Sequence, residues 1–248
     1  MTQNPFDQVA PDYEKVHNRN LPPGVSSDEF VTQKAAKVVE WITYSHKEKD
    51  FNYLDFGCGN GRLFKHLLAS PALQPLIAEG RLQLFGFDTS KKSLEEAGKI
   101  TGDSRVCFFS DFNQIADEIR FDLIICCNVF HHIVPAARDA TIKTLGDRMA
   151  RNARLALWEH NPYNPFTRLI VKTCPFDADA HLLTLNSAIT LFQRHSFHSC
   201  EHAYVNIFPP KLQRFKTLSA IENTFAQTPI GAQYFVIFGR EEEPADYL

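Results

Sequence analysis

The sequence lacks a long uncharged apolar run and has no large excess of either charge. No stretch approaches the roughly 20 apolar residues that a membrane-spanning helix needs. The first residues show no basic stretch followed by an apolar one, as a secretory signal would. The formal net charge of −3 at pH 7 gives no electrostatic footprint for nucleic acid. These absences predict a soluble, cytoplasmic protein that does not bind nucleic acid.

Cysteine never occurs in the Cys-x-x-Cys spacing, which excludes a zinc-ribbon site. Two of the six cysteines are adjacent inside an apolar run, where a free thiol behaves as a small buried hydrophobe. Reduced thiols in a cytoplasmic protein are therefore the expected state. The cysteines are Cys58, Cys107, Cys126, Cys127, Cys174 and Cys200.

The 248 residues, 44% of them hydrophobic and 22% charged, suffice for one large domain with a sizeable core. The first 24 residues are polar and broken by prolines. A capping box from Ser26 to Glu29 then opens an apolar pattern at helical spacing. We therefore expect residues 1–45 to form a helical lid segment and residues 46–248 to form the main domain, within one globular unit.

Strands and helices alternate through about residue 160. The short apolar runs at 51–56, 81–88, 105–109, 121–130 and 154–160 predict strands, and the segments between them show helical spacing. The run at 121–130 is apolar throughout, as in a strand buried on both faces. Such alternation predicts an α/β fold, Rossmann-like and doubly wound, with a mostly parallel sheet and right-handed crossovers.

The order changes after residue 160. A stretch rich in proline and asparagine leads to a predicted helix at 184–195, and two further strands are predicted at 200–208 and 232–240. Such a pair can form an antiparallel edge on a parallel sheet. The complete expectation is a seven-stranded sheet with an antiparallel C-terminal edge strand.

Three glycines at alternate positions, Gly57, Gly59 and Gly61, follow the first predicted strand. A dinucleotide fingerprint would place two residues between the second and third glycine, and a phosphate loop would end in Gly-Lys-Ser/Thr. Neither pattern is present, which argues against a nicotinamide oxidoreductase. Asp55 would repel a pyrophosphate at this turn, so the turn better suits a ligand with an ammonium or sulfonium group.

The segment "LDFGCGNG" resembles the first motif of the class I S-adenosylmethionine-dependent methyltransferases. "FGFDTS", "FFSDF" and "FDLIICCNVFHHI" resemble the motifs that follow the second, third and fourth strands of that family. All four lie in the family's order at predicted strand ends, where open α/β sheets bind ligands. The resemblance implies the family's fold, its methyl-transfer activity and S-adenosyl-L-methionine as cofactor.

The resemblance also implies cofactor contacts, residue by residue. The acid after the second strand would bind the ribose hydroxyls, although it can also cap the following helix. The acid after the third strand would bind near the adenine amino group, although it can also be a solvated loop acid. An N-terminal tyrosine would cover the cofactor, unless it only anchors a surface helix. The implied contacts are Asp55, Gly57, Cys58, Gly59, Gly61, Asp88, Thr89, Asp111, Phe112, Asn128 and Tyr13.

Catalysis would need little beyond alignment, because S-adenosylmethionine is already an activated electrophile. A hydroxyl acceptor is helped by a base, and histidine has a suitable pKa. His132, which aligns with the commoner family histidine, is the first candidate, followed by His131 and Glu159, with His160 adjacent. Each of these can instead be a packed or hydrogen-bonded side chain. Their spacing matches no firm metal motif, so no metal is expected.

The distal part, with "WEHNPYNPFTRLIVKTCPFDADAHLL" and "FPPKLQRF", is similar to a bacterial branch associated with polysaccharide or lipid-linked glycan assembly. This implies a small-molecule or lipid/glycan-linked acceptor that offers a hydroxyl or similar nucleophile. The basic, partly amphipathic segment 211–225 is a solvated helix or a peripheral membrane contact. The family's Pro-Gly-Gly before the fifth strand is absent, which alters a turn far from the transferred methyl group.

Two questions stay open at this point. A catalytically inactive S-adenosylmethionine-binding regulatory protein would keep the same glycine turn and acids, so it is the alternative to an enzyme. A monomer and a homodimer both fit the pattern, since an edge strand near the C-terminus can pair across a dimer.

Overall fold

A computed structural model describes residues 5–8, 13–19, 21–45 and 49–240. Within this part, one mixed sheet of seven strands runs in the order β3-β2-β1-β4-β5-β7-β6. The strands are β1 (Phe51–Phe56), β2 (Leu82–Phe87), β3 (Val106–Phe109), β4 (Phe121–Cys127), β5 (Met149–His160), β6 (Phe197–Val205) and β7 (Gln233–Arg240).

The first five strands are parallel to one another, and the order reverses at β1, which pairs with both β2 and β4. The reversal leaves a crevice beyond the carboxyl ends of β1 and β4, where open α/β sheets bind their ligands. All four motif segments lie at the carboxyl ends of β1 to β4, so the topology brings them to one edge of the sheet.

The two distal strands complete the sheet, and the expected fold class is confirmed. β7 is antiparallel to both β5 and β6. The C-terminal strand therefore does not lie at the very edge: β7 is inserted next to β5, and β6 is outermost. Periodicity identifies a strand but not its neighbours, which is why the sequence predicted the antiparallel pair and not its internal order.

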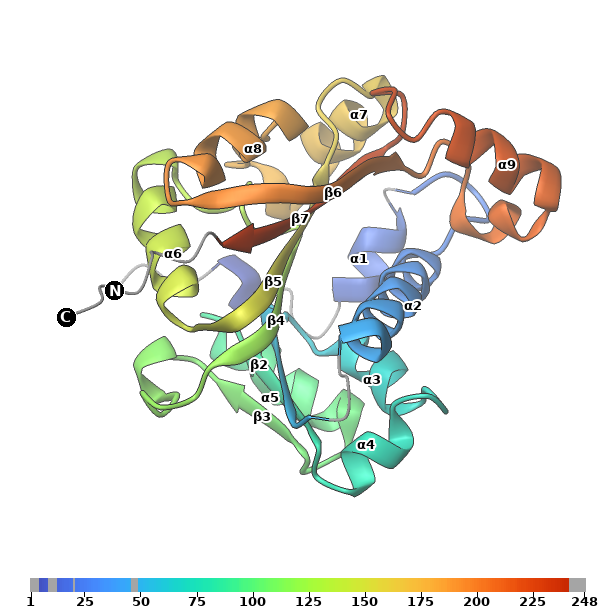
Figure 1. Cartoon of the computed structure of the whole chain (residues 1–248). Helices are drawn as coiled ribbons and strands as arrows, with labels where there is room; N and C mark the ends of the chain where they lie inside the picture. The colour runs from blue at the N-terminus through green and yellow to red at the C-terminus, as the bar shows by residue number, and fades with distance from the viewer. Residues whose placement is uncertain (1–4, 9–12, 20, 46–48, 241–248) are drawn as a thin grey trace.

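Helices cover both faces of the sheet (Figure 1). The core on one face contains Ile142 of α6 (Pro135–Asp147) and Phe192 of α8 (Leu185–Gln193). The core on the other face contains Val38 of α2 (Ser27–Ser45) and Phe64 of α3 (Arg62–Leu68). The remaining helices are α1 (Tyr13–Arg19), α4 (Gln74–Ala78), α5 (Lys91–Thr101), α7 (Pro165–Thr173) and α9 (Lys216–Thr224), with 3₁₀ turns η1 (Pro5–Gln8), η3 (Phe112–Gln114), η4 (Pro175–Asp177) and η5 (Pro210–Arg214).

Strand β1 shows how sequence fixes the two faces. Successive side chains of a strand point to opposite faces, so Tyr53 joins the core beneath α2 while Leu54 joins the core beneath α6. Asp55 follows on the same face as Tyr53 and is also buried. A carboxylate thus replaces an apolar side chain on the α2 face, where the strand reaches the crevice.

The N-terminal segment divides into two parts. Helix α2 packs in the core through Ala35, Val38 and Ile42, so it is a structural layer of the main domain. Ahead of it, the Oγ atom of Ser90 donates a hydrogen bond of 2.6 Å to Asp7 of η1. The ring of Phe6 lies edge-on to His132, with centroids 5.0 Å apart. The lid over residues 1–45 stays a prediction, and with α2 in the core it concerns the segment ahead of α2. No helix in the described part of the chain is long and apolar enough to cross a membrane.

Candidate active site

A cavity of about 630 Å³ lies at the carboxyl ends of β1 and β4. The glycine turn and the ends of β2 and β4 line its one side, and residues of α2 and α7 line the other. Its lining includes eight of the predicted site residues: Asp55, Gly57, Cys58, Gly59, Asp88, Thr89, Asn128 and His132. The sequence motifs therefore converge on one space that is large enough for a small-molecule ligand.

The three glycines of the turn serve different purposes. A Cβ atom on Gly57 would lie 2.3 Å from Cγ2 of Val129, and one on Gly61 would lie 2.8 Å from the Cβ atom of Ala97. A Cβ atom on Gly59 would meet no protein atom within 4 Å. Gly57 and Gly61 are thus required by packing against the loop after β4 and against α5, and Gly59 is the one whose open side faces the cavity.

Asp88 links the end of β2 to the glycine turn. Its Oδ2 accepts a hydrogen bond of 2.8 Å from the backbone N–H of Gly59, and its Oδ1 accepts one of 2.8 Å from that of Ser90. Burial raises the pKa of Asp88 despite these two hydrogen bonds. Each carboxylate oxygen accepts more than one hydrogen bond, so Asp88 can hold the turn and still accept from a ligand in the cavity. The cap of α5 is the Ser90 side chain.

Asp55 is the most unusual carboxylate of the cavity. It is buried, and its Oδ1 has no hydrogen-bond partner. Burial, and then the nearby charge of Asp88, raise the pKa of Asp55 to about 7, while Lys34 acts in the opposite direction. A buried polar atom without a partner is costly unless a ligand supplies one. Asp55 therefore fits a ligand that brings a positive charge or a hydrogen-bond donor.

Lys34 of α2 and Arg62 at the start of α3 also line the cavity, and no motif pointed to them. Lys34 is buried, with its Nζ atom 5.7 Å from the ring centroid of Trp158. Burial lowers the pKa of Lys34, and neighbouring acidic groups oppose that shift. Arg62 donates hydrogen bonds to Ser27 and Asp28. A signal for Lys34 did exist, because it lies on the apolar face of α2 next to Ala35.

Several predicted cofactor contacts do not line the cavity. Asp111 is exposed, and its carboxylate accepts hydrogen bonds from the backbone N–H and the Nδ2 atom of Asn113, so it caps η3. Phe112 packs edge-on against Phe56 and Phe87, which do line the cavity. Phe112 therefore packs behind the two phenylalanines that line the cavity. The side chain of Tyr13 lies outside the described part of the structure.

Glu159, at the end of β5, is a buried clamp for the loop after β4. Its Oε1 accepts hydrogen bonds of 2.9 and 2.7 Å from the backbone N–H groups of Val129 and Phe130. Its Oε2 lies 2.5 Å from Nδ1 of His131. The pKa of Glu159 is lowered because the charge of His131 and these hydrogen bonds outweigh burial. Glu159 and His131 do not themselves line the cavity, so they act through their neighbours.

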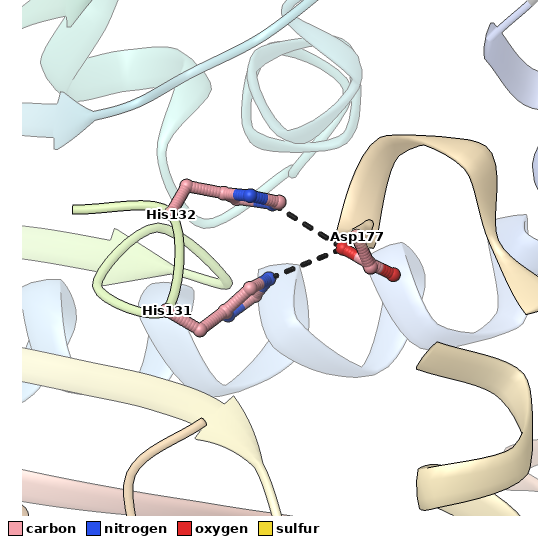
Figure 2. Close-up of side chains that lie close together, drawn as sticks. All are labelled: His131, His132 and Asp177. Atoms are coloured by element: carbon pink, nitrogen blue, oxygen red, sulfur yellow. Dashed lines mark ion pairs between the residues drawn. The ribbon is translucent and has the colours of Figure 1, made fainter. Parts of the chain in front are cut away.

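His131 lies between two carboxylates (Figure 2). Its Nε2 atom is 3.5 Å from Oδ1 of Asp177, which belongs to η4 and was not predicted. Burial alone would lower the pKa of His131, but Glu159 and Asp177 together raise it to about 9. Asp177 has its own pKa lowered, because the hydrogen bond and charges of the histidines outweigh burial.

His132 and His160 present their rings to the cavity. Burial, and then the charge of His131, lower the pKa of His132 to about 4 and that of His160 to about 3. Nε2 of His132 lies 3.4 Å from the same Oδ1 atom of Asp177 (Figure 2). The lining after β4 and at the end of β5 therefore carries neutral imidazoles, whose ring nitrogens can accept a hydrogen bond or bind a cation.

Residues 54–155 match the family model described as a methyltransferase domain. No curated protein matches the sequence. Solved structures match most of the chain at low sequence identity, and a likeness of this kind shows only that the fold is shared.

One similar structure is magnesium protoporphyrin IX methyltransferase from Synechocystis with bound S-adenosylhomocysteine: 18% identity, 95% of this chain and 98% of that chain covered, TM-score 0.60. A second is an S-adenosylmethionine-dependent methyltransferase from Archaeoglobus fulgidus: 12% identity, 86% and 94% covered, TM-score 0.57. A third is the plantazolicin methyltransferase BpumL in complex with S-adenosylhomocysteine: 14% identity, 96% and 95% covered, TM-score 0.60.

The match to the methyltransferase domain confirms the expected enzyme class over residues 54–155. S-adenosylmethionine, the methyl donor of that class, is the corresponding cofactor. The matched region runs from β1 into β5 and includes the glycine turn, Asp88 and His132. Helices α2 and α7, which line the other side of the cavity, lie outside the matched region.

Proposed function

We propose that this methyltransferase moves the methyl group of S-adenosylmethionine to a hydroxyl or similar nucleophile of a small-molecule or lipid/glycan-linked acceptor. The observation that carries the proposal is that one cavity is lined both by the glycine turn with Asp55 and Asp88 and by His132 and His160. Transfer requires both reactants in one water-poor space, with the nucleophile aligned on the sulfonium methyl group.

The adenosine half of the cofactor would lie along β2. Asp88 would accept the ribose hydroxyls, helped by Thr89, while the open side of Gly59 lets the cofactor approach the backbone. The rings of Phe56 and Phe87, whose centroids are 4.9 Å apart, offer an apolar wall. Asp111 and Phe112 would shape the adenine end from behind that wall. Cys58, Gly57 and Gly61 keep the turn in the required conformation.

The methionine half would lie between β1 and α2. Its ammonium group pairs well with Asp55, whose Oδ1 has no other partner. Its carboxylate pairs well with Lys34 or Arg62, the two buried cations of the cavity lining. Such a zwitterion satisfies charges that would otherwise remain costly in a buried site. Asn128 completes this end of the cavity.

The acceptor would then lie against His132, the predicted residue that activates it. His131 and Glu159 are positioning residues, since the Glu159 carboxylate holds both the His131 ring and the loop that carries His132. The imidazoles on the acceptor side favour an enzyme over an inactive regulatory protein, because cofactor binding alone does not need them.

The composition of helix α7 supports an acceptor with an apolar part. Thr167 and Ile170 of α7 line the cavity, while Phe166 and Leu169 on the other face of the same helix are exposed. Arg168 and Lys172 are exposed between and beyond them. An amphipathic helix of this composition can lie on an anionic membrane surface, which would suit a lipid-linked acceptor. Co-sedimentation with anionic vesicles tests this part, and no binding would remove it.

Titration calorimetry with S-adenosylhomocysteine tests the cofactor site. We expect micromolar binding by the wild type, a loss of at least tenfold in Asp88→Ala, and no change in Asp103→Ala. Asp103 is a matched surface carboxylate that pairs with Arg105 outside the cavity. No binding by the folded wild-type protein would overturn the proposal. Transfer of labelled methyl groups to lipid and small-molecule extracts then identifies the acceptor and separates an enzyme from a regulatory protein.

A further inference from the structure

Three metal-ligating groups converge beside the cavity, and one of them, His132, also lines it (Figure 2). Two come from adjacent residues after β4, His131 and His132, and the third from η4, Asp177. One ring nitrogen of each histidine and one carboxylate oxygen lie within 4.8 Å of one another. Segments about 45 residues apart in the sequence thus present a two-histidine, one-carboxylate set.

The contacts between Asp177 and the two histidines are long for hydrogen bonds, and their spacing also fits a shared ion. Oδ1 of Asp177 lies 3.5 Å from Nε2 of His131 and 3.4 Å from Nε2 of His132, beyond the usual range for N–H···O hydrogen bonds. Ligands about 2.1 Å from a tetrahedral zinc ion stand roughly 3.4 Å apart. We propose that His131, His132 and Asp177 bind one divalent transition-metal ion, with Zn²⁺ as the fitting representative.

The hydrogen bonds around His131 resemble those that usually orient a metal-ligating histidine. A ligating histidine commonly donates its other ring N–H to a carboxylate, which fixes the ring and its tautomer. Nδ1 of His131 lies 2.5 Å from Oε2 of Glu159. The backbone N–H of His181 donates a hydrogen bond of 2.7 Å to the carbonyl of His131. Arg138 donates to the carbonyls of Ile133 and His181, joining the two ligand-bearing segments.

Three protein ligands leave one tetrahedral position for a small molecule, as in catalytic zinc sites. His132 lines the cavity, and so does His160, whose ring centroid is 5.2 Å from that of His131. The remaining position is therefore available to a ligand atom in the cavity. This step rests on the proposed function: the ligand atom is the acceptor oxygen. The acceptor then belongs to the class of metal-binding hydroxyl compounds.

The chemistry balances without a redox partner. A bound cation lowers the pKa of the acceptor hydroxyl, and the proton passes to solvent water. The oxygen then bonds to the methyl carbon, and the electron pair of the broken carbon–sulfur bond stays on sulfur. The products are the methyl ether, S-adenosylhomocysteine and one proton. His132 thus activates the acceptor as a ligand of the cation.

Zinc titration of the full chain, dialysed first against a chelator, tests the site by calorimetry and by metal content. We expect one Zn²⁺ per chain that is lost in His132→Ala and Asp177→Ala, with affinity at least 100-fold lower. The matched control is His195→Ala, which removes another histidine–carboxylate pair: Nε2 of His195 lies 2.7 Å from Oδ1 of Asp139. That variant should retain the ion. The exposed Cys107 and Cys200 are present in every variant, so any zinc they bind cancels in the comparison.

Co²⁺ absorption gives a second readout, because a four-coordinate site has strong visible bands that the two ligand variants should lose. Titration with S-adenosylhomocysteine runs in parallel and reports whether each variant is folded. Zinc loss with cofactor binding retained supports the site. A wild type that binds no more zinc than His132→Ala overturns it, even if cofactor binding is intact. A wild type that binds zinc but no S-adenosylhomocysteine would keep the metal site and overturn the proposed function.

Discussion

At the scale of single residues, Asp55 is a buried acid whose ionisation opposes folding in the absence of ligand. Its pKa is about 7 in the folded chain against 3.8 for an ordinary aspartate. The raised pKa means that its favourable contribution is present below pH 3.8 and is lost as pH rises toward 7. The loss is on the order of 4 kcal/mol over this window.

Replacing Asp55 by Asn should remove that loss. We expect the free energy of unfolding of Asp55→Asn, relative to that of the wild type, to increase as pH rises from 4 to 8, so that the variant becomes the relatively more stable protein. Urea unfolding across this pH range, without cofactor, measures the difference. Parallel pH profiles for the two proteins would contradict the assignment of a raised pKa to Asp55.

Lys34 should bind one end of the cofactor and not the other. Substitution Lys34→Met keeps a long side chain and removes the charge. We expect it to weaken S-adenosylhomocysteine by about tenfold, or roughly 1.4 kcal/mol. It should leave 5′-methylthioadenosine, which lacks the amino-acid group, unchanged. Calorimetry with both ligands tests this, and equal weakening of the two would mean that Lys34 acts through the fold.

The sequence predicted those site residues that belong to contiguous motifs. Asp55 and Asp88 lie at the ends of predicted strands and Gly59 follows one, and all three line the cavity because parallel strands bring their carboxyl ends together. Lys34 and Asp177 were missed because tertiary packing brings each to the site. Lys34 enters the cavity lining from a helix before the motifs, and Asp177 lies next to His132 from a turn after them. No local pattern encodes that two such segments meet.

At the scale of elements, the glycines of the turn have different roles: Gly57 is required by packing, and Gly59 is open toward the cavity. Gly57→Ala would drive a Cβ atom into Val129, whereas Gly59→Ala has open space. Both glycines have positive φ, +81° and +52°, so each substitution also carries about 1–2 kcal/mol of backbone strain. We expect Gly57→Ala to lower the melting temperature clearly more than Gly59→Ala. Thermal unfolding tests this, and equal losses would contradict it.

Elements with strong periodicity were predicted to within a few residues, and their partners were not. β5 begins at Met149, five residues before the run at 154 that predicted it, because Met149 still pairs with Phe121 of β4 ahead of an irregular part of the ladder. Its burial pattern confirms the difference, with the first four residues partly or fully exposed. The position of β7 between β5 and β6 depends on contacts more than 70 residues apart in sequence, which local patterns do not contain.

At the scale of the whole molecule, the cofactor should stabilise the native chain, because the cavity is assembled from β1, β2, β4, α2 and α7. S-adenosylhomocysteine at about 100 times its Kd contributes about 2.7 kcal/mol. For a chain of this size that raises the melting temperature by about 5–10 °C. Differential scanning calorimetry measures the shift. Asp88→Ala at the same ligand concentration should show a smaller one, and an unchanged wild-type transition would contradict the cavity as the cofactor site.

The inserted strand also has a consequence for synthesis. Gln233, the first residue of β7, lines the cavity and accepts a hydrogen bond of 3.0 Å from Nε1 of Trp158. β7 supplies the only strand that joins β6 to β5 in the described sheet. A nascent chain therefore carries all of its recognisable motifs long before it has a closed cavity. If the cavity binds the cofactor as proposed, we expect a nascent chain to capture it only after residues 233–240 have left the ribosome.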